Sequence, residues 1–211
     1  MGPIPGETRM PGDELDRRQK IDRLKRLMEG MRTEVHVVDG GRWVDIFAEI
    51  IREKGLGDLL YSPKTDVGIA LEKHWKRVGD RGENLPELIP YEENVEDFKR
   101  RLFDVAAAIT TSRGAIADSG AVVLCPDEKE PRLMSLVPPV HIVVLNGDSI
   151  YGDLFDFLER EGGHQSMPTN VVLVSGPSKT ADIELTLAFG VHGPKELILF
   201  ICSSSFCDEL K

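Results

Sequence analysis

Short, uninterrupted runs of Val, Leu and Ile limit the folds open to this chain more than any other feature of its sequence. The clearest are VHIVVLN, residues 140–146, and ELILFI, residues 196–201, and AVVL and VVLV are further examples at 121–124 and 171–174. These runs lack the polar–apolar alternation of a strand that has one face in water. We therefore expect a mostly parallel sheet that is covered on both faces.

Segments with helical periodicity alternate with these runs. Apolar residues recur at helical spacing in residues 14–31, which predicts an amphipathic helix with Asp13 as its N-cap and an end near Gly30. Further helices are expected at 42–55, 95–105 and 147–161, with a short one near 69–78 followed by a loop. Strands that alternate with helices of this length indicate an α/β domain.

The chain has 211 residues, which suits one domain over 14–211 preceded by a Gly- and Pro-rich tail over 1–13. A net charge of −10 argues against non-specific binding to nucleic acid, which needs a basic surface. No stretch approaches the roughly 18 apolar residues of a membrane span. The first residues also lack the apolar core of a signal peptide. These features predict a cytoplasmic protein without a membrane span.

Cysteine and histidine are too sparse to suggest a cofactor. The three cysteines, Cys125, Cys202 and Cys207, suit a reducing compartment, and an Fe–S cluster would take four thiolates. No two histidines have metal-ligand spacing such as i, i+4. We therefore expect neither a metal nor a cofactor on this chain.

Ligands of open α/β sheets bind at the carboxyl ends of parallel strands. Three loops that leave expected strands fit this rule: 61–65, 110–120 and 175–182. Each is rich in Ser, Thr or Gly.

The third loop, SGPSKTAD, precedes an apolar stretch that resembles a helix. Its backbone N–H groups, with the side chains of Ser178, Lys179 and Thr180, would then form an anion site at a helix start. The same residues could instead only cap the helix, and Asp182 would already compensate its dipole. Both interpretations remain open.

The second loop contains SRGAIADSG, where Asp118, Ser119 and Gly120 could form a turn or face a ligand. Arg113 is the loop's one basic residue and could pair with a carboxylate or phosphate. His192, in GVHGP, would lie near a helix C-terminus, either as a structural partner of the dipole or as a base. The ligand-binding candidates are Arg113, Ser119, Gly120, Gly176, Ser178, Lys179, Thr180, Asp182 and His192.

Two motifs in these loops resemble the lactate utilisation protein C family, the LutC/YkgG group of LUD-domain proteins. GPSKTADIE at 176–184 and GVHGP at 190–194 match its C-terminal signature, and GAIADSGAVVL at 114–124 resembles an upstream element. Ala121 stands where that family commonly has Thr or Ser, so one hydroxyl is missing. The resemblance covers roughly residues 30–205.

The resemblance implies a three-layer α/β/α fold with a mixed, mostly parallel sheet, similar to the sugar-phosphate isomerase and CoA-transferase group. It also implies a role in oxidising L-lactate to pyruvate, with Fe–S oxidoreductase partners that carry the redox centres. The alternative is a free-standing binder or enzyme for a small phosphorylated or carboxylated metabolite. The family supplies no catalytic residues to carry over, so whether the chain is an enzyme stays open.

Overall fold

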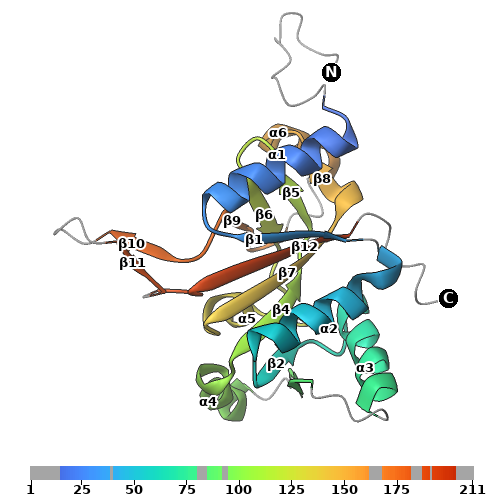
Figure 1. The fold of residues 1–211 in the computed structure, drawn as a ribbon. Helices are drawn as coiled ribbons and strands as arrows, with labels where there is room; N and C mark the ends of the chain where they lie inside the picture. Colours follow the sequence, from blue (N-terminus) through green and yellow to red (C-terminus); the bar gives the residue numbers. More distant parts are fainter. Residues whose placement is uncertain are drawn as a thin grey trace, which may run out of the picture.

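The computed structural model describes residues 15–38, 40–79, 85–91, 95–161, 168–181, 187–190 and 192–202. Its main sheet has six strands in the order β1-β12-β7-β4-β2-β3, and every neighbouring pair is parallel (Figure 1). The strands span Glu34–Val38 (β1), Asp58–Tyr61 (β2), Glu87–Pro90 (β3), Ala107–Thr111 (β4), Val140–Asn146 (β7) and Glu196–Cys202 (β12).

A second sheet of four strands runs β8-β5-β6-β9 and contains both parallel and antiparallel pairs. A two-stranded hairpin, β10–β11, extends away from both sheets (Figure 1). These strands span Gly114–Ile116 (β5), Ala121–Leu124 (β6), Ile150–Tyr151 (β8), Val172–Val174 (β9), Lys179–Ala181 (β10) and Leu187–Phe189 (β11).

The helices are those that the sequence periodicity predicts, with one short addition. They span Arg17–Gly30 (α1), Trp43–Lys54 (α2), Asp66–Gly79 (α3), Val95–Asp104 (α4), Arg132–Leu136 (α5) and Leu154–Glu161 (α6), with 3-10 turns at Gly40–Arg42 (η1) and Gly147–Ser149 (η2). Asp16 caps α1 in place of Asp13, through a reciprocal capping box with Gln19. Gly55 ends α2 in the left-handed conformation, as expected.

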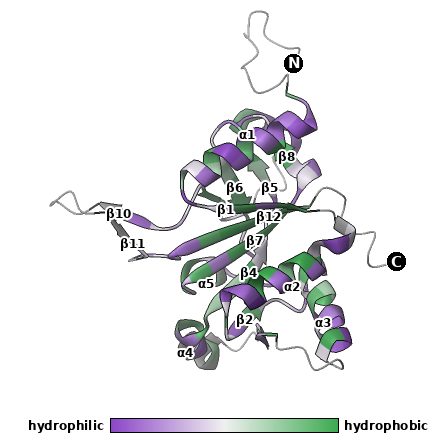
Figure 2. Ribbon diagram, in the orientation of Figure 1, coloured by the Kyte–Doolittle hydropathy of each residue, from purple (hydrophilic) through white to green (hydrophobic). Residues whose placement is uncertain are grey.

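The continuous apolar runs bury both faces of the main sheet. In β7, Ile142 and Val144 pack with α2 and α3, whereas Val143 and Leu145 pack with α1 and the second sheet. The central strands are correspondingly mostly apolar, while the helices keep a hydrophilic face (Figure 2). The prediction of an α/β fold with a mostly parallel sheet covered on both faces is therefore confirmed.

The second sheet is the main departure from the expected layers. One face of the second sheet packs together with α1 against the main sheet. The other face packs against Phe157 of α6. Residues 147–153, expected as the start of a helix, instead form η2 and β8, and α6 begins at Leu154. The loop expected after α3 contains β3. No described helix is both long and apolar enough to span a membrane.

Candidate functional site

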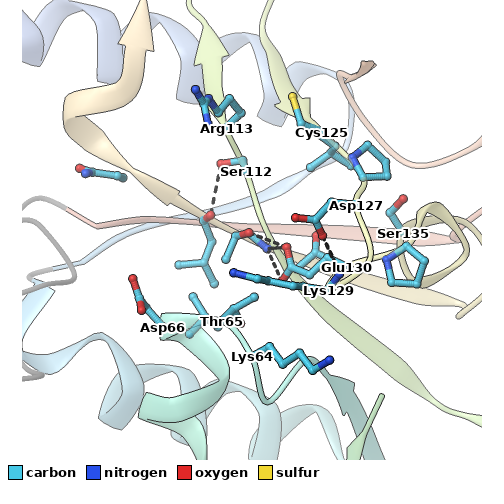
Figure 3. A pocket seen from close by; sticks show the side chains of 18 residues that line it. Lys64, Thr65, Asp66, Ser112, Arg113, Cys125, Asp127, Lys129, Glu130 and Ser135 are labelled. Carbon is cyan, nitrogen blue, oxygen red and sulfur yellow. Dashed lines mark hydrogen bonds between the residues drawn. The ribbon is translucent and has the colours of Figure 1, made fainter. Parts of the chain in front are cut away.

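Loops at the carboxyl ends of β2, β4, β6 and β7 enclose a cavity of about 410 Å³, the carboxyl-edge cavity (Figure 3). Two of the three loops selected from the sequence, 61–65 and 110–120, contribute to it. Its polar wall is formed by Lys64, Thr65, Asp66, Thr110, Thr111, Ser112, Arg113, Asp127, Lys129, Glu130, Ser135 and Asn146. The strand-end rule therefore places the site where polar groups converge.

The loop after β2 is held in place by its own short hydrogen bonds. The Thr65 hydroxyl donates to the carbonyl of Ser62 at 3.0 Å and accepts the Gly68 N–H at 3.1 Å, so Thr65 caps α3. Gly68 packs on the same carbonyl, where a Cβ atom would lie 1.9 Å from the Ser62 oxygen. This packing aims the positive end of the α3 dipole at the cavity.

The loop after β6, CPDEKEP, is a turn closed by Asp127. The Asp127 carboxylate accepts the backbone N–H groups of Lys129 at 2.8 Å and Glu130 at 2.9 Å. Pro131 then forms the N-cap of the short helix α5. The turn therefore fixes Glu130 beside the end of β4.

Glu130 is the most constrained acid of the cavity. Its two carboxylate oxygens accept the Thr111 N–H at 3.1 and 3.0 Å, and Oε2 also accepts the Thr111 hydroxyl at 2.5 Å. Burial raises the pKa of Glu130, and the hydrogen bonds from Thr111 offset only part of that rise. The structure thus presents one carboxyl group at a fixed position in the cavity wall.

Thr110, one residue earlier, turns to the interior of the sheet. Its hydroxyl lies 2.8 Å from Nε2 of His141 on β7, and both residues are buried. Burial lowers the pKa of His141 to about 3, so the imidazole is neutral at physiological pH.

Cations and anions share the cavity. Lys64 and Arg113 lie on different walls, and the side chain of Lys129 extends across the opening (Figure 3). Arg113 pairs with Glu161 at 2.6 Å. Three acids, Asp66, Asp127 and Glu130, face the same space. This balance suits a small ligand with one anionic group and further polar atoms better than a densely charged anion.

Cys125 lies at the rim of the carboxyl-edge cavity. Burial raises the pKa of its thiol, although Arg113 partly opposes that rise. A raised pKa disfavours the reactive thiolate form. The geometry gives this cysteine no activated role.

The GPSKTAD motif does not begin a helix, so that prediction is wrong. Residues Lys179–Ala181 form β10, which pairs with Leu187–Phe189 as an antiparallel hairpin. The two motif halves instead meet at the base of this hairpin. The Ser178 N–H donates to the Pro194 carbonyl at 2.8 Å, and the Gly190 N–H donates to the Ser178 carbonyl at 3.0 Å. The anion site at a helix start therefore has no helix to form it.

Gly176 has a packing reason to be glycine. A Cβ atom there would lie 2.8 Å from the Met31 carbonyl oxygen, just after α1. Gly190 has φ +74°, in the left-handed region that favours glycine. Close packing against Met31 accounts for glycine at position 176, and the left-handed backbone conformation accounts for glycine at position 190.

The hairpin base borders a smaller cavity of about 170 Å³, the hairpin-base cavity, near the amino ends of β7 and β12. Gly176, Ser178 and His192 line it together with His141. The third predicted loop therefore lies at the edge of the sheet opposite to the one expected. Lys179 is exposed on β10, the side chain of Thr180 is not described, and Asp182 lies outside the described residues.

Ser119 and Gly120 belong to the turn between β5 and β6. Gly120 has φ +59°, and a Cβ atom there would lie 2.5 Å from Cβ of Leu27 on α1. The neighbouring Asp118 pairs with Arg23 of α1 at 3.1 Å. Of the nine predicted candidates, the structure thus places Arg113 at the carboxyl-edge cavity, and it does not bring Ser119 or Gly120 to either cavity.

A third cavity, of about 450 Å³, lies between α2 and α3. There, Asp45 contacts His74 at 3.2 Å and Arg77 at 2.8 Å. It lies away from the strand ends, so the carboxyl-edge cavity remains the candidate site. Within the described ranges, no group of three or more His, Cys, Asp or Glu side chains is arranged to hold a metal ion.

Sequence reasoning missed Thr111, Lys129 and Glu130 as site residues. Thr111 lies in the second of the three loops, 110–120, but no local sequence pattern distinguishes it from the other residues of that loop. The signal for Glu130 is the turn CPDEKEP, where Asp127 lies three residues before it and prolines flank both sides.

A sequence profile of the LUD domain matches residues 21–202. An uncharacterised protein of Neisseria meningitidis serogroup B is 35% identical over 185 residues, which cover 85% of this chain and 77% of that protein. Lactate utilization protein C of Bacillus subtilis is 27% identical over 84% of this chain and 69% of its own length. The protein of that name from Macrococcus caseolyticus is 29% identical over 71% of this chain, and the match spans 63% of its length.

The crystal structure of a DUF162 family protein from Deinococcus radiodurans has the same fold. It superimposes with a TM-score of 0.62 at 17% identity, covering 90% of this chain and 99% of that one. The domain profile spans most of the chain, and the Neisseria protein is similar over 85% of it. Together these two matches establish the family of this chain. The chain belongs to the LUD domain family, in the group of the lactate utilization C proteins.

Proposed function

We propose that this protein is a component of a lactate-utilisation system and binds a small carboxylate in the carboxyl-edge cavity. Several relatives carry the name lactate utilization protein C, which supports the role. The observation that supports the binding site most strongly is the convergence of four strand-end loops on one polar cavity of about 410 Å³. A cavity of this size accommodates a small metabolite.

In this proposal, the carboxylate of the ligand lies near Lys129, within the positive field of the α3 N-terminus. Lys129 extends across the cavity, and Asp66 and Val67 of the first turn of α3 line it (Figure 3). The three acids that line the same cavity, Asp66, Asp127 and Glu130, leave room for one negative charge rather than two. This favours a monocarboxylate such as lactate over a phosphate ester.

We further propose that Fe–S partner proteins accept the electrons from lactate and that this chain has no redox centre of its own. The two described cysteines belong to different parts of the fold, Cys125 after β6 and Cys202 at the end of β12. Purified alone, the protein should bind lactate without oxidising it. Reconstitution with the Fe–S partners should give oxidation of lactate that depends on this chain, and oxidation without this chain would contradict the role.

Calorimetric titration with L-lactate and pyruvate tests the binding site directly. Lys129→Ala should weaken binding of at least one of the two by about tenfold, the value of one charge-assisted hydrogen bond. Lys76→Ala is the matched control, because Lys76 is an exposed lysine of α3 outside the cavity. Loss of binding in both variants, or in neither, would contradict the assignment of the site.

A free-standing binder of phosphorylated metabolites is the second candidate. The α3 N-terminus, close to Lys64, favours it, since helix N-termini bind phosphate. Sugar phosphates and CoA esters should be titrated beside lactate. Binding of these compounds without binding of lactate or pyruvate would select the second candidate.

A further inference from the structure

We propose that Glu130 makes the carboxyl-edge cavity selective for a 2-hydroxy carboxylate over the corresponding 2-keto carboxylate. The inference rests on the function proposed above, because lactate and pyruvate are such a pair. It adds the group that would distinguish them.

The geometry of Glu130 leaves one oxygen able to accept a further hydrogen bond. Oε2 accepts both the N–H and the hydroxyl of Thr111, whereas Oε1 accepts only the Thr111 N–H among the contacts of the described residues. A carboxylate oxygen accepts two hydrogen bonds. Oε1 therefore has acceptor capacity left for a ligand.

The position of this oxygen is fixed from two sides. Thr111 is the last residue of β4, held in register with Val144 of β7. On the other side, Asp127 closes the turn that carries Glu130. A carboxylate held this way cannot turn aside when the ligand is a poor match.

The two ligand classes differ at one atom. The hydroxyl of a 2-hydroxy acid donates a hydrogen bond to an ionised carboxylate, whereas the carbonyl oxygen of a 2-keto acid can only accept one. Placed against ionised Glu130, that carbonyl oxygen would face lone pairs and lose its hydrogen bonds to water. Ionised Glu130 therefore favours the hydroxy acid.

Protonation of Glu130 reverses the match, because a neutral carboxyl group donates its O–H. Burial places the pKa of Glu130 above its ordinary value, so the change falls at a higher pH than for an exposed glutamate. The other charged groups that line the cavity are Asp127 and Lys129 from its own turn, Lys64 from the loop before α3, Asp66 from the first turn of α3, and Arg113 after β4. Below the pKa of Glu130 the keto acid gains affinity, and above it the hydroxy acid is preferred.

The test is calorimetric titration of the full chain with L-lactate and pyruvate at pH 8 and pH 5. At pH 8, the wild-type protein should bind lactate about tenfold or more tightly than pyruvate, as expected for one mismatched hydrogen bond. At pH 5 the ratio should fall. Equal affinities at pH 8, or a ratio that does not change with pH, would overturn the inference.

Glu130→Gln should bring the ratio close to one at both pH values, because an amide both donates and accepts and does not titrate. Glu128→Gln is the matched control: Glu128 is exposed on the same turn and does not line the cavity, so its variant should keep the wild-type preference. A preference retained by Glu130→Gln would refute the role of Glu130.

The wild-type pH series does not depend on the folding of any variant. If neither ligand binds the wild-type protein, the proposed function and this inference both fail. If both bind without preference, the binding site stands and only the selectivity of Glu130 is refuted.

Discussion

The carboxyl-edge cavity and the hairpin base lie at opposite edges of the same sheet and are built in opposite ways. The hairpin base contains the longest recognisable motif, yet the residues of this motif mainly make backbone contacts. Gly176 packs against Met31, and the backbone of Ser178 hydrogen-bonds with Pro194 and Gly190. The cavity contains no continuous motif, and its polar side chains come from four separate loops. A recognisable stretch of sequence can thus mark an architectural junction, while a ligand site is assembled from scattered residues.

Gly68→Ala should have the largest effect, because it damages the cavity edge directly. The new Cβ would lie 1.9 Å from the carbonyl oxygen of Ser62, and neither backbone segment can move away without breaking the cap of α3. We expect a loss of about 3–5 kcal/mol in the free energy of unfolding, together with loss of lactate binding. Denaturant unfolding measures the first, and Gly79→Ala, in open space at the end of α3, should leave it nearly unchanged.

Gly176→Ala should have the next largest effect and should separate the two regions. Its Cβ would meet the Met31 carbonyl oxygen at 2.8 Å, so we expect a loss of about 1–3 kcal/mol. Lactate affinity should persist in the folded fraction, since the hairpin base does not line the cavity. Gly30→Ala is the control on α1, and a Gly176 variant that is stable but fails to bind would show that the two regions are coupled.

His141 provides an effect that depends on pH and is small near neutral pH. Its pKa of about 3 in the folded protein lies below the value near 6.5 of an exposed histidine, so the unfolded chain binds more protons between these values. The contribution of His141 to the free energy of unfolding is fully present above about pH 6.5. It falls by about 1.4 kcal/mol per pH unit as the pH drops toward 3. His141→Gln should make the pH dependence of the free energy of unfolding shallower, which denaturant unfolding at several pH values would measure.

Lys179→Ala should have the smallest effect of all. Lys179 is exposed on β10, so we expect a change in stability within about 0.5 kcal/mol and unchanged lactate affinity. Thermal unfolding and calorimetry on the same preparation would check both. A clear loss of lactate affinity in Lys179→Ala would show that the signature motif contributes to the ligand site. It would contradict the difference described between the two regions.

The sequence predicts the main sheet and its helices well, because both depend on local patterns. The runs at 140–146 and 196–201 are buried on both faces, and the spacing of Ile21, Leu24 and Met28 faces α1 toward the core. The second sheet escaped prediction, because β5 and β8 have only three and two residues and are stabilised by pairing rather than by periodicity. The helix expected after SGPSKTAD failed for a similar reason: Leu187–Phe189 is a strand because Lys179–Ala181 pairs with it.

The sequence predicts where the candidate site lies, but it does not predict which residues form the site. Strand-end loops lead to the edge that holds the carboxyl-edge cavity, through 61–65 and 110–113. That Glu130 meets Thr111 depends on residues 19 positions apart that no local pattern connects. The position of the loop at 175–178 could not be read either, because it follows β9 of the second sheet instead of a strand of the main sheet.

The strand order has a consequence for biosynthesis. β12 lies between β1 and β7, although it is the last described strand to be made and β1 is the first. While the ribosome is still adding residues 147–195, β1 and β7 lack the strand that joins them. The backbone edge of β7 that pairs with Ile198 and Phe200 of β12 therefore has no partner. The main sheet can close only after synthesis passes residue 202, so the nascent chain exposes unpaired strand edges until β12 has been made.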